Sequence, residues 1–452
     1  MNKILPTIGP INDNQIDIKK ILKFSNTIRI NGSHNTLSWH KRVANIIKDI
    51  NDKTTILMDV PGIKPRTANV KDIVINKNQI ITFVYGKKFN KNIDNIIRIT
   101  NPLPQINKKS KSFSINDGQH EFTLISYEKN YVKGKSKTAF ILKPKKGLNI
   151  PYSIYDEIGQ LKIYLNFIEK YKTVRSDALG LSFIQSKSIL RKINKKFPNK
   201  IIVAKVENYL GLKNVEEICK YSDIIMIDRG DLAAEIGDNH LYSAVVKISS
   251  TAKKYGRPLI MATENLESMI TRKTPTKSEV VSLGFSLSLN ADKIMLSDET
   301  ATSSNWLNSI KWLDQFLKIN DDKKNIKSRN SSHFWDIVKN IPKNIPIVIF
   351  SKKGLAIEKI SHIKSNSQVI VFTDNKKTAS ICAFRSDTTV LIANNFDRSK
   401  KSSYIYDNIK ANKNLIFKNN TSAVVIYIFN PRKKSRANTI SLVEKKDFIK
   451  NI

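Results

Sequence analysis

The stretches Ile201-Ile-Val-Ala-Lys-Val-Glu-Asn208 and Ile224-Ile-Met-Ile-Asp-Arg-Gly-Asp-Leu232 decide the fold of this chain. Each is a short apolar run that stops abruptly in charged residues. Runs rich in Ile and Val are typical of strands buried on both faces of a parallel sheet. Lys205, Glu207 and Asp231 then lie at the carboxyl ends of neighbouring strands, the rim where parallel barrels carry their chemistry. A divalent-metal site beside a fixed positive charge is predicted there; salt bridges at two strand ends are the alternative.

The same alternation of strands and helices occurs on both sides of these stretches. Residues 1–67 carry a helical pattern from Trp39 to Ile50 between two strand-like runs, Thr27-Ile-Arg-Ile30 and Thr55-Ile-Leu-Met58, which is typical of βαβ units. Residues 151–325 return to this pattern. Their expected strands are Ala178–Phe183, Ile201–Val203, Ile224–Ile227, Pro258–Ala262 and Lys293–Leu296. Together the two parts supply enough strands for an interrupted (β/α)8 TIM barrel.

The interruption, residues 68–150, loses the helical pattern. It has short runs of alternating apolar residues at 79–85 and 122–126, and turn signals at Asn116-Asp-Gly118 and Lys133-Gly-Lys135. These features predict a small all-β insertion, for which a β-barrel is expected.

A second α/β pattern follows the barrel. A polar segment rich in Lys and Asn, near Asp321 to Ser332, separates the two. The expected strands beyond it are Ile345–Phe350, Gln368–Phe372 and Ala423–Tyr427. The predicted domains are therefore 1–67 and 151–325 for the barrel, 68–150 for the insertion and 326–452 for a C-terminal α/β domain.

The composition is that of a globular protein. Its 452 residues are too many for one core, and 40% of them are hydrophobic. No apolar run reaches the ~18 residues of a membrane span. The N-terminal segment has no signal-peptide pattern and predicts a strand that ends at the turn Gly9-Pro10. Cys219 and Cys382 lie far apart in apolar contexts, so we expect buried free thiols in a reducing cytoplasm, with no disulfide and no zinc site.

The formal net charge of +38 raises the question of a nucleic-acid or membrane-surface partner. The cations are mostly Lys, spread thinly along the chain, whereas Arg, the better ligand for phosphates and bases, is sparse. No motif of a nucleic-acid-binding module occurs. The sequence therefore does not favour nucleic acid as the main partner. We expect the basic surface to attract anionic metabolites.

Polar clusters follow other expected strands as well. In Arg29-Ile-Asn-Gly-Ser-His34, the alternation of a strand points Arg29, Asn31 and Ser33 the same way. Such a set can bind a phosphate and, through neutral oxygens, a monovalent cation. The alternative is a strand-to-helix loop in which Ser33 or Asn35 caps the next helix.

Three further strand ends give weaker signals. Asp59-Val-Pro-Gly-Ile-Lys-Pro-Arg66 combines turn formers with both charges, while Thr263 and Ser297 each follow an apolar run. For a lone Thr or Ser at such a position, helix capping is the ordinary explanation.

Set in order, these clusters resemble the pyruvate kinase family, and the resemblance extends over essentially the whole chain. The matching motifs are Thr-Ile-Gly-Pro at 7–10, Arg-Ile-Asn-Gly-Ser-His at 29–34, Asn-Asp-Gly at 116–118, Lys-Gly-Leu-Asn-Ile-Pro at 146–151, Leu-Ser-Phe at 181–183, Lys-Val-Glu-Asn at 205–208, Arg-Gly-Asp-Leu at 229–232, Ala-Thr-x-x-Leu-Glu-Ser-Met at 262–269 and Ile-Met-Leu-Ser-x-Glu-Thr-Ala at 294–301. Several are weak alone, but their order and spacing are highly specific.

The resemblance implies a barrel, a β lid and a C-terminal α/β domain, usually assembled as a homotetramer. It implies phosphoryl transfer from phosphoenolpyruvate to ADP, giving pyruvate and ATP. By motif, Glu207 and Asp231 would hold Mg²⁺ or Mn²⁺, which suits hard cations and carboxylates. The residues that would contact substrate or take part in catalysis are Lys205, Thr263, Ser297, Arg29, Gly230 and Asp231.

Among these, Lys205 would neutralise the phosphoryl group and the enolate, and Arg29 would bind the phosphate. Backbone N–H groups of Gly230 and Asp231, with the Thr263 hydroxyl, would hold the substrate carboxylate. Ser297 and Thr263 would belong to the relay that protonates the enolate.

The resemblance also implies sites for nucleotide and K⁺. The implied nucleotide contacts are Asn31, His34, Arg66, Lys146 and Asp117, with Lys146 at the lid hinge and Asp117 reaching over on closure. The implied monovalent site consists of Asn31, Ser33, Asp59 and the carbonyl of Val60. Lys64 stands where K⁺-dependent members have Glu, and Lys there accompanies K⁺ independence. The expectation is that its ammonium replaces the ion; the alternative is that Lys64 points to solvent.

Several positions depart from the family pattern. After Asp59 the family usually has Thr-Lys-Gly-Pro-Glu-Ile-Arg, where this chain has Val60-Pro-Gly-Ile-Lys-Pro-Arg66. Asp298 replaces a Gly, Glu264-Asn265 replaces Gln-Met, and Gln185 replaces a common Arg. The loop at 351–354 resembles the activator-binding loop of the family only loosely, so an effector site is not assigned.

These departures leave two alternatives to an active pyruvate kinase. One is a paralogue that acts on another enolpyruvyl or keto-acid substrate in a biosynthetic pathway. The other is a weakly active scaffold or nucleic-acid-associated protein, against which the intact Lys205, Glu207, Asp231 and Thr263 argue.

Overall fold

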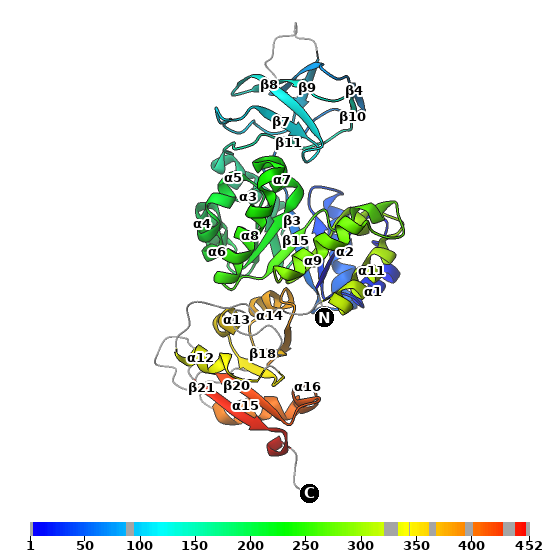
Figure 1. The fold of residues 1–452 in the computed structure, drawn as a ribbon. Coiled ribbons are helices and arrows are strands. Elements are labelled where there is room, and N and C mark those ends of the chain that lie inside the picture. Colours follow the sequence, from blue (N-terminus) through cyan, green and yellow to red (C-terminus); the bar gives the residue numbers. More distant parts are fainter. Residues whose placement is uncertain are drawn as a thin grey trace.

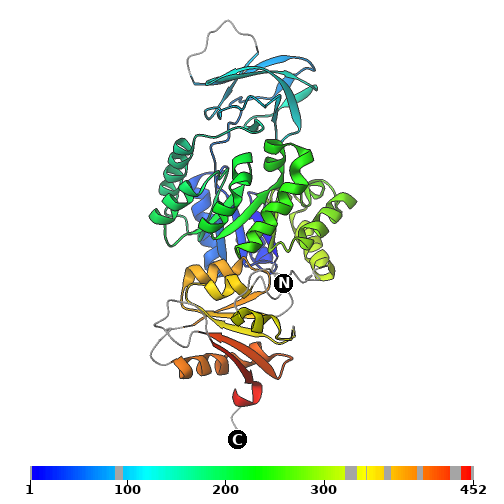
Figure 2. The same cartoon turned by 60° about the vertical axis from the view of Figure 1, so that its left-hand side comes forward.

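The computed structural model describes residues 3–86, 95–320, 333–342, 344–360, 368–393, 401–427 and 439–448. They form three stacked blocks, with a β block at one end, a barrel in the middle and an α/β block at the other end (Figures 1 and 2). The prediction of a barrel interrupted by a β domain and followed by an α/β domain is confirmed.

A closed barrel of parallel strands forms the centre of the molecule. Its eight strands, in the order β1-β16-β15-β14-β13-β12-β3-β2, are β1 (Ile4–Ile8), β16 (Lys293–Leu296), β15 (Leu259–Ala262), β14 (Ile224–Asp228), β13 (Ile201–Val206), β12 (Ala178–Leu181), β3 (Thr55–Val60) and β2 (Thr27–Asn31). The strands that flank the insertion, β3 and β12, are hydrogen-bonded neighbours, with Asp59 opposite Gly180. The insertion therefore leaves the barrel and returns at the same place.

Alternation along each strand separates the barrel interior from the layer under the helices. On β13, Ile201 and Val203 pack inside the barrel, whereas Ile202 and Ala204 pack outward. The period of 2 then turns Lys205 inward at the carboxyl end of the strand. On β14, Ile224 and Met226 lie inside, which turns Asp228 inward in the same way.

Helices surround the barrel and cover its outward-facing apolar residues. They are α1 (Gln15–Leu22), α2 (Leu37–Ile50), α3 (Glu157–Lys170), α4 (Lys187–Lys196), α5 (Tyr209–Lys213), α6 (Val215–Tyr221), α7 (Arg229–Ile236), α8 (Asp238–Lys254), η1 (Glu267–Ile270), α9 (Lys277–Ser288), α10 (Asp298–Ala301) and α11 (Trp306–Asn320). Helix α2 is capped by Thr36, whose hydroxyl accepts from the N–H of Trp39 at 3.2 Å. Capping by Ser33 or Asn35 was therefore the wrong alternative.

The insertion forms two sheets beyond the carboxyl end of the barrel. The six-stranded sheet, in the order β11-β7-β8-β9-β5-β6, contains β11 (Leu148–Asn149), β7 (Ser112–Ile115), β8 (His120–Glu128), β9 (Tyr131–Ser136), β5 (Ile80–Tyr85) and β6 (Ile96–Ile99). The second sheet pairs β4 (Ile73–Ile75) with β10 (Phe140–Leu142).

One turn predicted in the insertion is wrong. Lys133-Gly-Lys135 lies inside β9, which pairs with both β5 and β8. The glycine is needed for packing, because a Cβ at Gly134 would collide with the ring of Phe113. The chain turns instead between Glu128 and Tyr131, which pair with each other.

The C-terminal block is a mixed sheet in the order β19-β18-β17-β20-β21. Its strands are β17 (Ile347–Phe350), β18 (Val369–Thr373), β19 (Thr388–Ile392), β20 (Ser422–Tyr427) and β21 (Thr439–Glu444). Its helices are α12 (His333–Lys339), α13 (Leu355–Ile360), α14 (Lys376–Ala383), α15 (Lys401–Ala411), α16 (Lys413–Phe417) and η2 (Lys445–Phe448). Just after α14, the ring of Phe384 packs with the interior residues of the barrel and closes its amino-terminal end.

Other expectations have mixed outcomes. Cys219 and Cys382 are buried free thiols, as predicted. Among the described residues, no helix combines the length and apolar character of a membrane span. The polar segment at 321–332 lies outside the described residues. The proposed domain boundaries fall between the strand groups, since β3 ends at Val60, β4 begins at Ile73 and β11 ends at Asn149; the boundaries themselves stay a prediction.

Candidate active site

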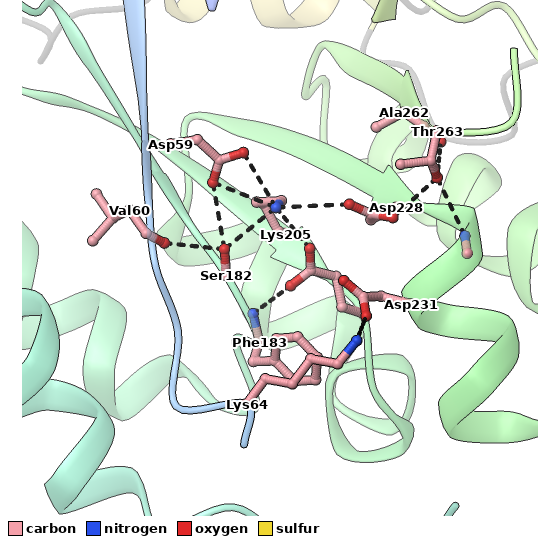
Figure 3. A network of polar contacts seen from close by, with 12 residues as sticks. Asp59, Val60, Lys64, Ser182, Phe183, Lys205, Asp228, Asp231, Ala262 and Thr263 are labelled. Atoms are coloured by element: carbon pink, nitrogen blue, oxygen red, sulfur yellow. Dashed lines mark hydrogen bonds and ion pairs between the residues drawn. The ribbon is translucent and has the colours of Figure 1, made fainter. Parts of the chain in front are cut away.

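Charged side chains from several strand ends converge around Lys205 at the carboxyl end of the barrel (Figure 3). Lys205 is at the centre of this group and is only 5% exposed. Its ammonium lies 2.8 Å from Glu207, 3.3 Å from Asp59 and 3.7 Å from Asp228. It also donates to the hydroxyl of Ser182 at 3.3 Å. Residues on or directly after four neighbouring strands, β3, β12, β13 and β14, therefore surround one buried cation.

The acidic surroundings fix the charge of Lys205. Burial alone would lower the pKa of this ammonium, but the carboxylates of Asp59, Glu207 and Asp228 outweigh burial and raise it. Asp59 responds in the opposite direction. Burial alone would raise the pKa of Asp59, but Lys205 and Arg29 lower it by more. The pKa of Asp59 is therefore below its ordinary value, and the group is an anion. The site thus holds a permanent positive charge shielded from water.

Three carboxylates can converge on one cation at this rim. Glu207, Asp228 and Asp231 each offer an oxygen, and these oxygens lie within 4.8 Å of one another. Sequence reasoning named Glu207 and Asp231 but missed Asp228. The sequence did indicate Asp228. Alternate residues of a strand face the same side, so Asp228 faces the barrel interior together with Ile224 and Met226.

The chemistry of this carboxylate cluster suits a hard divalent ion. Burial is the main cause that raises the pKa of Glu207, and the neighbouring Asp228 and Asp231 add to it against the effect of Lys205. Burial also raises the pKa of Asp231, opposed by Lys64. Burial and mutual repulsion make the charge of these carboxylates costly, and a divalent cation placed between them would offset that cost. The residues present therefore fit Mg²⁺ or Mn²⁺.

Arg29 lies beside this cluster on β2. Its Nε and Nη2 donate to Oδ2 of Asp59 at 2.9 and 2.8 Å, and its Nη1 donates to Thr7 at 3.0 Å. Arg29 is 7% exposed, and its guanidinium is fixed by these two partners. The predicted phosphate ligand is thus close to Lys205, since both contact Asp59.

Thr263 has an unusual backbone conformation directly after β15. Its φ is +57°, in the left-handed region that β-branched residues rarely adopt. The Arg229 guanidinium donates to the Thr263 carbonyl, and the Thr263 hydroxyl donates to Asp228 at 3.0 Å. The same hydroxyl accepts from the N–H of Gly230 at 3.2 Å. The predicted substrate-carboxylate ligands Gly230 and Thr263 are therefore adjacent, and strain next to a cluster of charge is typical of functional sites.

Two of the family departures lie at this point. Asn265 is fully buried, accepts from Arg229 at 2.8 Å and donates to the Met295 carbonyl at 2.7 Å, so it connects the ends of β14 and β16. Glu264 also has positive φ, and burial raises its pKa. Gln185, a third departure, is bound to Tyr155 through the N–H and the carbonyl of that residue, both at 2.9 Å.

The predicted nucleotide ligands lie along the edge between barrel and insertion. Burial and the nearby charge of Arg66 lower the pKa of His34, and the charge of Asp298 opposes them. Arg66 donates to the Lys145 carbonyl at 3.3 Å. Lys146 pairs with Thr67 through their backbones at 2.9 Å, where the two connections of the insertion run side by side.

The predicted monovalent site is assembled only in part. Asn31 and Asp59 are opposite each other on β2 and β3. The Asn31 side chain accepts from the N–H of Ser33 at 3.0 Å, and the Val60 carbonyl accepts from Ser182 at 3.0 Å. Lys64 is buried rather than turned to solvent, so the solvent-facing alternative is wrong. Its ion pairs, however, are with Asp117 and Asp231.

The hydrogen bonds of the predicted catalytic residue Ser297 in the described part of the chain are made by its backbone. Its N–H donates to Glu299 at 2.6 Å, and its carbonyl accepts from Ala301 at 2.9 Å. No hydrogen bond among the described residues joins Ser297 to Thr263. It begins α10 without a side-chain cap bond, so the capping explanation does not account for its hydroxyl.

Glu235 is a buried acid that sequence reasoning missed. It lies on α7, the helix that carries Asp231, and accepts from Asn149 of β11 at 3.0 Å and from Tyr155 at 2.7 Å. Burial raises its pKa to about 8. The returning connection of the insertion is therefore bound to the helix of the carboxylate cluster. The one sequence feature that could have indicated Glu235 is its position in the helix that begins with the Arg-Gly-Asp-Leu motif.

Comparisons with known proteins agree with the motifs. A family model described as the barrel domain of pyruvate kinase matches residues 1–310. The chain is 28% identical to a pyruvate kinase of Borreliella burgdorferi, over 94% of this chain and 89% of that protein. It is 27% identical to a pyruvate kinase of Thermotoga maritima, over 83% of this chain and 85% of the relative. A pyruvate kinase of Buchnera aphidicola is 28% identical over 88% of this chain and 89% of its own length.

Proposed function

Because the chain belongs to the pyruvate kinase family, we propose that it transfers the phosphoryl group of phosphoenolpyruvate to ADP in glycolysis. The bond from phosphorus to the enol oxygen breaks, and a bond to a terminal phosphate oxygen of ADP forms. The resulting enolate takes a proton on its methylene carbon and becomes pyruvate. The observation that supports this most is the buried ammonium of Lys205 beside three carboxylates suited to a divalent ion.

Each named group has a role that its position supports. Lys205 neutralises the charge that builds on the phosphoryl oxygens and the enolate, in a pocket where water does not screen it. Arg29, held rigid by Asp59, binds the phosphate. Glu207, Asp228 and Asp231 would hold the divalent ion, which would supply positive charge to stabilise the transferring phosphoryl group.

The substrate carboxylate is assigned to the backbone of Gly230 and Asp231 at the start of α7, where helix N–H groups favour an anion. The Thr263 hydroxyl is adjacent and, with Ser297, is assigned to the proton relay. The nucleotide is assigned to Asn31, His34, Arg66, Lys146 and Asp117. Family membership also supports a homotetramer in the cytoplasm.

A coupled assay tests this function. Phosphoenolpyruvate with ADP, GDP or UDP should yield pyruvate only when Mg²⁺ or Mn²⁺ is present. A chain without turnover under these conditions, but with turnover of another enolpyruvyl or keto-acid phosphate, would establish the paralogue instead. That second candidate is favoured by Asp298 and Glu264, which add negative charge where the family has neutral residues.

K⁺ dependence provides a separate prediction. Lys64 brings a tethered positive charge to Asp231 rather than to Asp59, and we propose that this charge at the rim serves in place of a recruited ion. We expect near-full activity in buffer containing only Na⁺ or tetramethylammonium, and an acquired requirement for K⁺ in Lys64→Glu. Initial rates at constant ionic strength measure both. Loss of most wild-type activity on withdrawal of K⁺ contradicts the prediction.

A further inference from the structure

Lys64 connects the β insertion to the barrel through one buried side chain. Lys64 lies just before the first segment that connects the barrel to the insertion. Its side chain packs against Gly147, which lies in the second connecting segment. A Cβ at Gly147 would collide with Cε and Nζ of Lys64, so the glycine makes room for it. The Lys64 side chain is 4% exposed although its ammonium carries a full charge.

The ammonium of Lys64 is held by one acid from each part. It donates to Asp117 of the insertion at 2.7 Å and to Asp231 of helix α7. Asp117 lies in a turn of three left-handed residues, with φ values of +59°, +53° and +91° from Asn116 to Gly118. This conformation directs the Asp117 carboxylate at the barrel rim. Burial alone would lower the pKa of Lys64, but the two carboxylates raise it, so the group is charged.

Asp231 therefore belongs to two sets of interactions. It is the barrel partner of Lys64, and it is also one of the three carboxylates whose oxygens lie within 4.8 Å. A divalent ion at that cluster would be repelled by the Lys64 ammonium, since both would contact Asp231. They also compete for the same charge on Asp231.

We propose that Lys64 is a positioning residue that holds the β insertion against the barrel through Asp117 and Asp231, and that its ammonium competes with the divalent ion for Asp231. The proposal rests on the proposed function only in taking Glu207, Asp228 and Asp231 as the divalent site. Lys64 keeps the insertion placed over the site while the ion is absent. Binding of the ion weakens that attachment.

The experiment measures position and metal affinity without turnover. Single cysteines at Lys129 of the insertion and Lys213 of the barrel carry a fluorescent pair, since native Cys219 and Cys382 are buried. Mn²⁺ affinity is measured by titration without substrate. In Lys64→Met we expect the pair to move apart and the Kd for Mn²⁺ to fall by about tenfold, because a competing charge is removed.

Two variants separate the proposal from general damage. Asp117→Asn alters an exposed lid side chain and should release the insertion while leaving the Kd for Mn²⁺ within about threefold. Lys137→Met breaks an ion pair with Glu121 inside the insertion, and neither quantity should change. If Lys64→Met does not fold, Asp117→Asn still tests the attachment.

Unchanged label separation in Asp117→Asn and Lys64→Met would overturn the proposal. So would separation without tighter Mn²⁺ binding in Lys64→Met, since competition for Asp231 would then be absent. If both responses occur but phosphoenolpyruvate is not turned over, the attachment by Lys64 stands and the proposed function fails.

Discussion

Lys205→Met is expected to lower kcat by about a thousandfold or more while changing KM for phosphoenolpyruvate far less. The ammonium already has three carboxylate partners in the resting site, so the charge of the substrate adds little to its environment. Its contribution grows when negative charge develops on the phosphoryl and enolate oxygens. Loss of such an interaction appears in kcat, whereas loss of uniform binding appears in KM.

The control for Lys205→Met is Lys200→Met at the other end of the same strand. Lys200 donates to Ser176, away from the rim, and its removal should leave kcat and KM close to wild type. A Lys205→Met enzyme whose only defect is a raised KM would show that Lys205 merely binds substrate. Circular dichroism should show both variants folded, because Met occupies much of the volume of the Lys stem.

The rim residues were predictable from the sequence because they depend on local rules. A strand has a period of 2, so apolar residues that face the interior identify which following residues join them. This rule places Lys205, Glu207 and Arg29 in the site. The same rule places Asp228 in the site. We did not predict it, because Asp231, three residues later in the Arg-Gly-Asp-Leu motif, already accounted for a carboxylate in that segment.

Contacts between distant segments could not be predicted. Lys64 and Asp117 are 53 positions apart and meet only because the insertion folds back over the barrel. The motif predicts the Lys64 ammonium at the monovalent site of Asp59, whereas in the structure it pairs with Asp117 and Asp231. Likewise, nothing local indicated that Gly134 serves packing against Phe113 rather than a turn.

Asp231→Asn is expected to lower kcat by about a thousandfold and to weaken Mn²⁺ binding, with folding nearly intact. Asn has the shape of Asp and keeps one neutral oxygen, so α7 retains its start. The buried ammonium of Lys64 keeps Asp117 as a charged partner. The divalent site, however, loses one of the three charges that balance the ion, and burial makes that loss large because water cannot replace it.

The measurements for Asp231→Asn are kcat at saturating Mg²⁺ and Mn²⁺ affinity without substrate. Asp238→Asn, at the start of the neighbouring helix α8, is the matched control and should keep both values, since it changes the same group outside the carboxylate cluster. Saturating metal should not restore the rate of Asp231→Asn, because the missing charge acts in the transition state as well as in binding. An Asp231→Asn variant with wild-type metal affinity and rate would remove Asp231 from the metal site and leave Glu207 and Asp228 as its carboxylates.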